Sequence, residues 1–211
     1  MTEGVNVKVK SIDCEMIFPT PIWYVEYEDF EKVNQGILDE MAKVDWDANQ
    51  KARGLQKELD HRHGEDIFIT PDLVPSAQPI VDGFANHCHQ IARELGWDLE
   101  HNQVNVTALW AHVTPPGKST LTHHHAPEHL SCAYYVRAPA ACGNLRFEDD
   151  RKHRIIEPEP RKFGLQTEIP AKEGRMVIFP SWLSHYVTEN CSNETRVSLS
   201  LNAKVLPKET H

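Results

Sequence analysis

The amino-acid sequence predicts a mostly β protein of the α+β type, a jelly roll or cupin-like barrel flanked by N-terminal helices. Three observations lead to this fold class. Up to Gly96, apolar residues recur with the 3.6-residue period of helices. After Gly96 they alternate with the two-residue period of strands. Turn-forming residues also separate these later segments at short, regular intervals, as in sandwiches and barrels.

The first half of the chain is expected to contribute one strand and two helices. Aromatic and β-branched residues interrupted by prolines predict an edge strand within 15–28. Helical stripes predict helices over 29–44 and 76–96, with Ser76 as a candidate N-cap and Gly96 at the C-terminal end of the second. The polar segment 45–75 is expected to be a surface loop, either a lid over a pocket or a disordered crossing.

The second half is expected to form the β core. Alternating segments predict strands at 103–113, 129–137, 143–148, 153–157, 175–180, 184–188 and 195–205. The two helices are expected to cover one face of one sheet. All 211 residues are expected to form a single domain, with 1–102 as supporting strand and helices and 103–206 as the core.

Composition excludes several classes of protein. Lys+Arg 22 against Asp+Glu 31 gives a net charge of −9, which argues against a nucleic-acid partner. No apolar segment approaches the roughly 20 residues of a membrane span. The five cysteines lack CxxC spacing, and the opening residues lack a signal-peptide pattern, so a cytoplasmic protein is expected. The 13 histidines are the unusual count, since histidine is the commonest metal ligand.

Histidines at two places in the chain predict a metal site. His123 and His125 lie between two predicted strands and, two residues apart, can face the same point, whereas His124 faces away. His185 stands at the start of a later strand. Each alone has an ordinary interpretation as a solvated or half-buried histidine. Together they have the order of a mononuclear non-haem iron site, in which few protein ligands leave coordination positions open.

Arg196 predicts an anion-binding group beside that site. It opens the last strand with Ser198 on the same face, while Val197 and Leu199 occupy the other face. An arginine that points into a barrel needs an anionic partner, and a ligand carboxylate would supply one. The alternative is a surface ion pair with Glu194 of little energetic consequence.

These pieces stand within longer motifs that resemble a known family. The motifs are HHHAPEHLSCAYYV at 123–136, GNLRFEDDR at 143–151, GRMVIFPSWLSH at 174–185, and the segment 190–202 with its RxSxSxN pattern. The chain resembles the 2-oxoglutarate- and Fe(II)-dependent oxygenase superfamily over about residues 108–205, and in particular a bacterial and phage branch with HxH. The resemblance implies a double-stranded β-helix over 103–206.

The resemblance also implies a cofactor, a cosubstrate and a reaction. His123 and His185 match metal ligands, and Arg196 and Tyr135 match the residues that hold the far carboxylate of 2-oxoglutarate, with Ser198 as a further contact. The implied protein is a hydroxylase that uses Fe(II), 2-oxoglutarate and dioxygen. It would act on a small-molecule or amino-acid/peptide-like substrate and release succinate and CO2.

One position departs from the superfamily, which usually has an aspartate where this chain has His125. Three interpretations remain: His125 is a third nitrogen ligand, Glu128 or Asp149 replaces the missing carboxylate, or water completes the site. The spacing of His125 from His123 favours the first.

The substrate pocket and the function class are less specified. Trp110, His112, Trp182 and Tyr186 are expected either to line a substrate pocket or to be core and rim residues. Two alternatives to the oxygenase are a cupin-like metal enzyme without a keto acid and a non-catalytic metal-binding jelly roll. Arg196 distinguishes the first, because such an enzyme needs no carboxylate anchor there. The sequence leaves the oligomeric state open.

Overall fold

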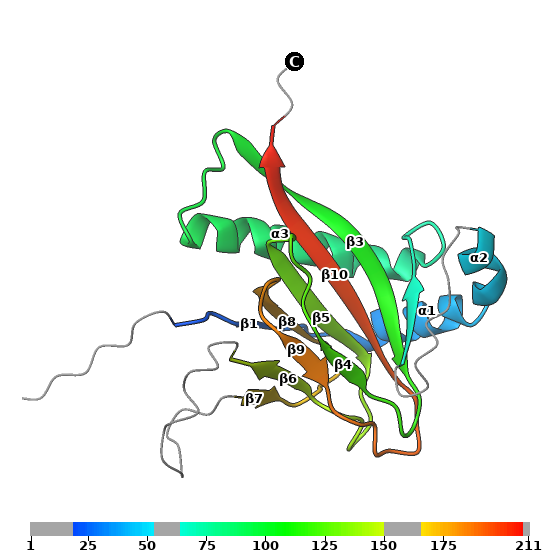
Figure 1. The fold of residues 1–211 in the computed structure, drawn as a ribbon. Coiled ribbons are helices and arrows are strands. Elements are labelled where there is room, and N and C mark those ends of the chain that lie inside the picture. Colours follow the sequence, from blue (N-terminus) through cyan, green and yellow to red (C-terminus); the bar gives the residue numbers. More distant parts are fainter. Residues whose placement is uncertain (1–18, 53–63, 150–165, 209–211) are drawn as a thin grey trace, which may run out of the picture.

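The computed structural model describes residues 19–52, 64–149 and 166–208, which form two antiparallel sheets (Figure 1). The six-stranded sheet has the order β1-β8-β5-β10-β3-β2, and the four-stranded sheet has the order β4-β9-β6-β7. The strands of the larger sheet are β1 (Trp23–Glu26), β2 (Glu65–Phe68), β3 (Asn102–Thr114), β5 (Leu130–Arg137), β8 (Arg175–Pro180) and β10 (Arg196–Pro207). Those of the smaller sheet are β4 (Thr120–His123), β6 (Leu145–Glu148), β7 (Gln166–Ile169) and β9 (His185–Val187).

Helices cover the outer face of the larger sheet. They are α1 (Glu31–Met41), α2 (Trp46–Ala52), the 3-10 turn η1 (Pro75–Ala77) and α3 (Gln78–Glu94). The long helix α3 crosses behind β3, β5 and β10, and α1 contacts β5 (Figure 1). Ile80, Phe84 and Cys88 lie four residues apart on α3 and are all buried, as the helical stripe predicts. The predicted helices and their place on one face of one sheet are confirmed.

Strict alternation along the central strands separates two cores. On β10, Val197, Leu199 and Leu201 pack with the helices in one hydrophobic cluster. Their neighbours Arg196 and Ser198 point to the other side, into the space between the sheets. The two-residue alternation in the sequence therefore gives the larger sheet two different faces. One is apolar and packs against the helices, and the other carries polar and apolar side chains around a cavity.

The second core lies between the two sheets. Tyr135, Val177 and Phe179 of the larger sheet pack against Leu145 and Phe147 of the smaller one. The two-sheet arrangement confirms the mostly β, jelly-roll fold class. The predicted edge strand is β1, which pairs only with β8 at the end of the larger sheet. The single domain with its core at 103–206 stays a prediction, although β1 and β2 place residues of the first half in the same sheet.

The structure contradicts two of the predictions made for the first half of the chain. The prediction that the segment 45–75 is a surface loop is wrong. The segment contains α2, and it also contains β2, which pairs with β3 inside the larger sheet. Ser76 does not cap α3: the helix begins after Ala77, and the Ser76 amide and hydroxyl both donate to the Glu40 carboxylate. A contact with α1, distant in sequence, thus outweighs the local capping preference of serine.

The second half differs from the prediction mainly in two short strands. Sequence alternation did not single out β4 or β7, which have only four residues each. Short strands show too few alternations to stand out from neighbouring loops. The predicted strand at 153–157 lies outside the described residues.

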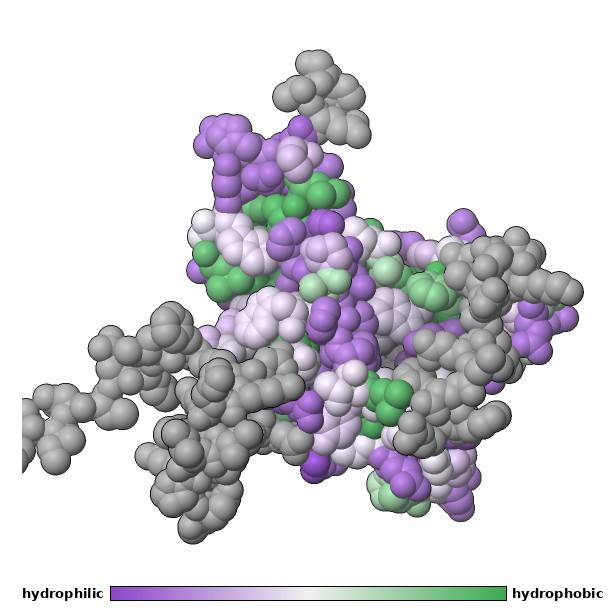
Figure 2. Space-filling view, in the orientation of Figure 1, coloured by the Kyte–Doolittle hydropathy of each residue, from purple (hydrophilic) through white to green (hydrophobic). Residues whose placement is uncertain are grey.

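The surface of the described residues carries both hydrophilic and hydrophobic side chains. Among these residues, no helix is long and apolar enough to cross a membrane. In Figure 2, hydrophobic residues on the face toward the viewer lie in separate small groups among hydrophilic ones. This distribution agrees with the low mean hydropathy of the sequence, −0.52, and with apolar residues gathered in the two cores.

The turn at Gly143 allows a direct test of this packing. Gly143 has φ +86°, and an added Cβ would lie 2.2 Å from the Thr188 carbonyl oxygen, so alanine there has to displace backbone. We expect Gly143→Ala to lower the free energy of unfolding by about 3 kcal/mol or more. Gly117→Ala is the matched control, because Gly117 has φ +76° but nothing within 4 Å of the added Cβ. Urea unfolding measures both, and equal losses would show that the close approach to Thr188 costs nothing.

Candidate metal centre

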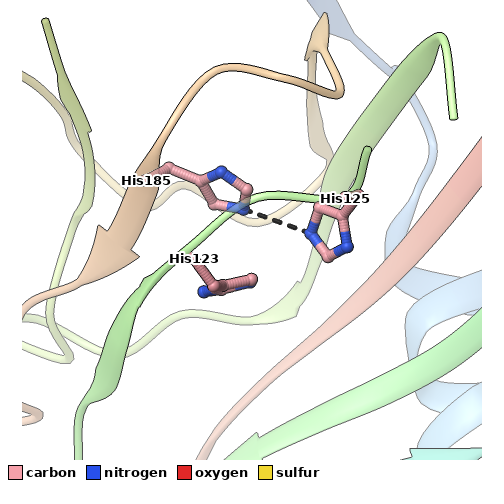
Figure 3. Close-up of side chains that lie close together, drawn as sticks. All are labelled: His123, His125 and His185. Atoms are coloured by element: carbon pink, nitrogen blue, oxygen red, sulfur yellow. Dashed lines mark hydrogen bonds between the residues drawn. The ribbon is translucent and has the colours of Figure 1, made fainter. Parts of the chain in front are cut away.

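Three histidines form the only group of metal-ligating side chains within the described residues. His123 ends β4 and pairs with His185 at the start of β9, so the smaller sheet places these two side by side. His125 lies two residues after the end of β4. One ligand atom from each ring lies within 4.8 Å of the others, and the three rings face a common space (Figure 3).

Hydrogen bonds fix which nitrogen of two of the rings faces that space. Nδ1 of His123 lies 2.7 Å from the Leu121 carbonyl oxygen, and Nδ1 of His185 lies 2.8 Å from the Leu183 carbonyl oxygen. A carbonyl only accepts, so each Nδ1 carries the proton and donates it. In the neutral rings Nε2 then keeps its lone pair, which is the state a metal ligand needs.

The environment keeps two of the rings neutral. Burial, followed by the charge of His123, lowers the pKa of His185 to about 3. The same two causes lower the pKa of His125 to about 4, although nearby Asp66 opposes the shift. Both rings are therefore neutral at neutral pH, and a metal does not have to displace a second proton from them.

The spacing of the nitrogens fits a single metal ion. Nε2 of His125 lies 3.3 Å from Nε2 of His185 (dashed line in Figure 3). Two nitrogens bound to one metal at about 2.1 Å, with an angle near 100°, lie roughly 3.2 Å apart. The donor set is all imidazole, which suits iron, zinc, copper or nickel.

The described residues bring no carboxylate into this group. The Glu128 carboxylate accepts a 2.8 Å hydrogen bond from the Thr107 hydroxyl instead. Asp149 is not among the three side chains that converge. His124 is exposed and its Nδ1 accepts the Ala126 amide, so it faces away from the group. Of the three interpretations of the third ligand, the geometry favours His125.

A cavity of about 390 Å³ connects this group with the larger sheet. His123, His125 and His185 form one wall, and Arg196 and Ser198 of β10 lie on another. The remaining lining residues are Asp66, Phe68, Ala108, Trp110, His112, Thr120, Cys132, Ala133, Leu145, Phe179, Val187, Ser200 and Asn202.

Arg196 is a buried cation that has no matching anion among the described residues. Its side chain is 1% exposed, and neither Nε nor Nη1 has a hydrogen-bond partner among the described residues. Its guanidinium carbon lies 5.2 Å from the centre of the Tyr135 ring. Such a group costs several kcal/mol unless an anion pairs with it, so its presence points to an anionic ligand.

Two buried hydroxyls beside Arg196 also lack a hydrogen bond of normal geometry. They are Tyr135 Oη and Thr114 Oγ1, and Thr114 is the cross-strand neighbour of Arg196. Burial raises the pKa of Tyr135 although the guanidinium opposes the shift, so the hydroxyl stays a donor. Thr114 was missed by the sequence reasoning. Its position two residues beyond His112, on the same face of β3, was the available signal.

Comparisons with known proteins identify the β core. Residues 108–202 match the model of a family described as "Putative 2OG-Fe(II) oxygenase". Over these residues, somewhat under half of the chain, the protein is similar to that family. The resemblance inferred from the sequence motifs is thus confirmed, and with it the double-stranded β-helix of the superfamily. A search of curated proteins found no match.

Several solved structures share the fold of this protein. A prolyl-4-hydroxylase from Pseudomonas putida has a TM-score of 0.60 and 13% identity, covering 88% of this chain and 92% of its own. HygX from Streptomyces hygroscopicus, solved with nickel and 2-oxoglutarate bound, has a TM-score of 0.57 and 8% identity, covering 88% and 83%. The carbocyclase SnoK from nogalamycin biosynthesis has a TM-score of 0.55 and 14% identity, covering 87% and 79%. At these identities the likeness shows the fold alone.

Two of the four residues expected in a substrate pocket lie at the cavity. Trp110 and His112 line it, and the Trp110 ring lies 5.3 Å from that of His125. Trp182 and Tyr186 are not among the lining residues. Trp182 is 54% exposed, and the Tyr186 hydroxyl accepts a 3.1 Å hydrogen bond from Arg146 outside the cavity.

Two residues that sequence reasoning missed also line the cavity. Asp66 and Phe68 of β2 reach it because β2 pairs with β3, which places Asp66 opposite His112 and Phe68 opposite Trp110. Oδ1 of Asp66 lies 2.6 Å from Nδ1 of His112, and Nε2 of His112 lies 2.8 Å from the Thr120 hydroxyl. The sequence feature that could have indicated a strand here is the alternation of Asp66 and Phe68 with Ile67 and Ile69, which are buried.

Proposed function

We propose that the chain is a 2-oxoglutarate- and Fe(II)-dependent dioxygenase that hydroxylates a small-molecule or amino-acid/peptide-like substrate. His123, His125 and His185 would hold the Fe(II). Arg196, Tyr135, Ser198 and Thr114 would hold the far carboxylate of 2-oxoglutarate. The observation that carries the proposal is that a metal-sized group of histidines and an uncompensated buried arginine face one cavity.

The residues present fit both missing groups. Three imidazoles, two of them kept neutral by burial, offer nitrogen to a metal and leave coordination positions open, as this chemistry requires. The donors of Arg196 and the Tyr135 hydroxyl offer a carboxylate several hydrogen bonds in a buried place, where charge-assisted bonds are strong. When bound together, Fe(II) and 2-oxoglutarate supply oxidation by dioxygen with release of succinate and CO2.

The chain itself positions these groups and excludes water. Leu121 and Leu183 orient two imidazoles through their carbonyls. Leu145, Phe179 and Val187 form an apolar wall beside the histidines. Such a wall shields that side of the reactive centre from bulk solvent.

Substrate and reaction type are the less constrained part of the proposal. The solved structures with this fold include prolyl hydroxylases and a carbocyclase, so the fold serves more than one oxidation. Hydroxylation of a small molecule or an amino-acid side chain is supported by the modest cavity with Trp110 and Phe68 on one wall. The absence of a nucleic-acid partner and a cytoplasmic location stay predictions from composition.

Arg196 weighs against a cupin-like enzyme without a keto acid. In such an enzyme the buried guanidinium would remain without an anion, and burial of a cation without an anion costs several kcal/mol. The same argument weighs against a jelly roll that only stores a metal.

Anaerobic reconstitution tests the proposal directly. We expect Fe(II) together with 2-oxoglutarate to give a weak visible charge-transfer band, because the keto acid chelates the metal. Fe(II) with succinate is the control, since succinate lacks the keto group and should give no band. Exposure to air should then yield succinate from 2-oxoglutarate. A folded, iron-loaded protein without the band would exclude 2-oxoglutarate as the cosubstrate.

A further inference from the structure

Three buried polar residues from separate sequence motifs meet behind the histidine group. They are Ser131 at the start of β5, Ser181 in the turn between β8 and β9, and Asn202 on β10. Ser131 and Asn202 are cross-strand neighbours in the larger sheet. The proposed function assigns no role to any of the three, so it does not explain why they lie together.

The hydrogen bonds among them run in one direction. The Ser131 hydroxyl donates to Oδ1 of Asn202 at 2.8 Å. The Ser131 and Ser181 hydroxyl oxygens lie 2.7 Å apart. A serine has one hydroxyl proton, and that of Ser131 is already donated to Asn202, so Ser181 is the donor to Ser131. The chain of donors therefore begins at Ser181 and ends on the rigid strand β10.

The main chain of Ser181 holds the segment that carries His125. Its carbonyl accepts the His125 amide at 2.8 Å, and its amide donates to the His129 carbonyl at 3.1 Å. His123 and His185 are placed by strand pairing, but His125 lies beyond the end of β4. Ser181 is thus bonded on one side to the sheet through its hydroxyl and on the other to the segment of the third histidine.

We propose that Ser181 is a positioning residue for His125: its hydroxyl, anchored through Ser131 to Asn202, fixes the turn whose main chain orients His125 toward the metal. The proposal rests on the proposed function insofar as His125 is a ligand. It explains how a residue outside the strands keeps a fixed direction, which a ligand at the third coordination position requires.

Cobalt(II) binding to the full chain tests this role without turnover. We measure the dissociation constant and the visible d–d spectrum of the Co(II) complex for the parent protein, Ser181→Ala, His125→Ala and the double variant. Ser181→Ala removes the anchor of the turn but keeps the main-chain bond to His125, so we expect it to weaken Co(II) binding about 10-fold, the lower end of the effect of losing an outer hydrogen-bond partner of a ligand. Its spectrum should shift toward that of His125→Ala.

The double variant separates positioning from general damage. In the His125→Ala background, Ser181→Ala should change the dissociation constant by less than about threefold, because the ligand it orients is gone. An equal loss in both backgrounds, or no loss in either, overturns the proposal. Failure of the parent protein to bind Co(II), or an unchanged affinity in His125→Ala, would instead contradict the proposed metal site.

Two further variants keep the test valid if Ser181→Ala folds poorly. Ser131→Ala breaks the next link of the same chain and should weaken Co(II) binding in the same direction; unchanged binding there also counts against the proposal. Ser76→Ala is the matched control, because the Ser76 hydroxyl is hydrogen-bonded to Glu40 at 2.8 Å and partly buried, away from the cavity. It should leave both the dissociation constant and the spectrum unchanged.

Discussion

Replacing His185 with alanine is expected to abolish iron binding and succinate formation. His185 is the most buried of the three histidines, and its Nε2 is directed at the shared space by the bond from Nδ1 to Leu183. Removing a ligand itself should cost more than the roughly 100-fold loss seen when only a ligand's hydrogen-bond partner is removed. Iron stoichiometry per chain and succinate yield measure the effect.

His124→Ala is the control for that experiment. His124 is adjacent to two of the proposed ligands in sequence, but its Nδ1 accepts the Ala126 amide at 3.2 Å and the ring is exposed. We expect it to keep full iron stoichiometry and succinate yield within about twofold, since exposed hydrogen bonds contribute little. Iron retained in His185→Ala but lost in His124→Ala would refute the assignment of the group.

Replacing Arg196 with methionine is expected to change cosubstrate affinity and stability in opposite directions. Two charge-assisted hydrogen bonds at about 1.5–3 kcal/mol each are lost, which raises the KM for 2-oxoglutarate by roughly 10² to 10⁴. Methionine also removes a buried, unpaired cation while filling a similar volume. The free energy of unfolding without ligands should therefore stay unchanged or rise, by up to about 4 kcal/mol.

Two measurements and one control separate these effects. Steady-state kinetics gives the KM, and urea unfolding gives the stability with and without Fe(II) and 2-oxoglutarate. Saturating 2-oxoglutarate should stabilise the parent protein but not Arg196→Met. Arg146→Met is the control, because Arg146 is on the outer face of the smaller sheet and pairs with Glu168. A variant that loses stability while keeping its KM would show that Arg196 serves the fold and not the cosubstrate.

Most of the fold was predictable because it follows from local periodicity. The helix α3 is visible in the spacing of Ile80, Phe84 and Cys88, and β10 in the alternation of Val197, Leu199 and Leu201. The segment 45–75 could not be assigned in this way, since polar residues at an edge strand resemble a loop. Only pairing with β3 makes β2 a strand.

The candidate site was predictable to the extent that it depends on neighbours in sequence. Two-residue spacing put His123 with His125 and Arg196 with Ser198. His185 was a candidate from its place at the start of a later strand, and the resemblance added Tyr135. Asp66 and Phe68 were not found because they reach the cavity through a strand partner that is distant in sequence. Thr114 was not found because its place beside Arg196 depends on the pairing of β3 with β10.

The sequence alone thus determined the residue types of a metal and carboxylate site and the faces of the strands that carry them, because side-chain alternation is a property of the extended chain itself. Tertiary structure decided the rest. The 3.3 Å approach of His125 to His185 depends on the register of β4 with β9 and on the bond between the His125 amide and Ser181. Two-residue spacing applies only while the chain is extended, and β4 ends at His123. Beyond that residue, only the fold directs His125 to the metal site.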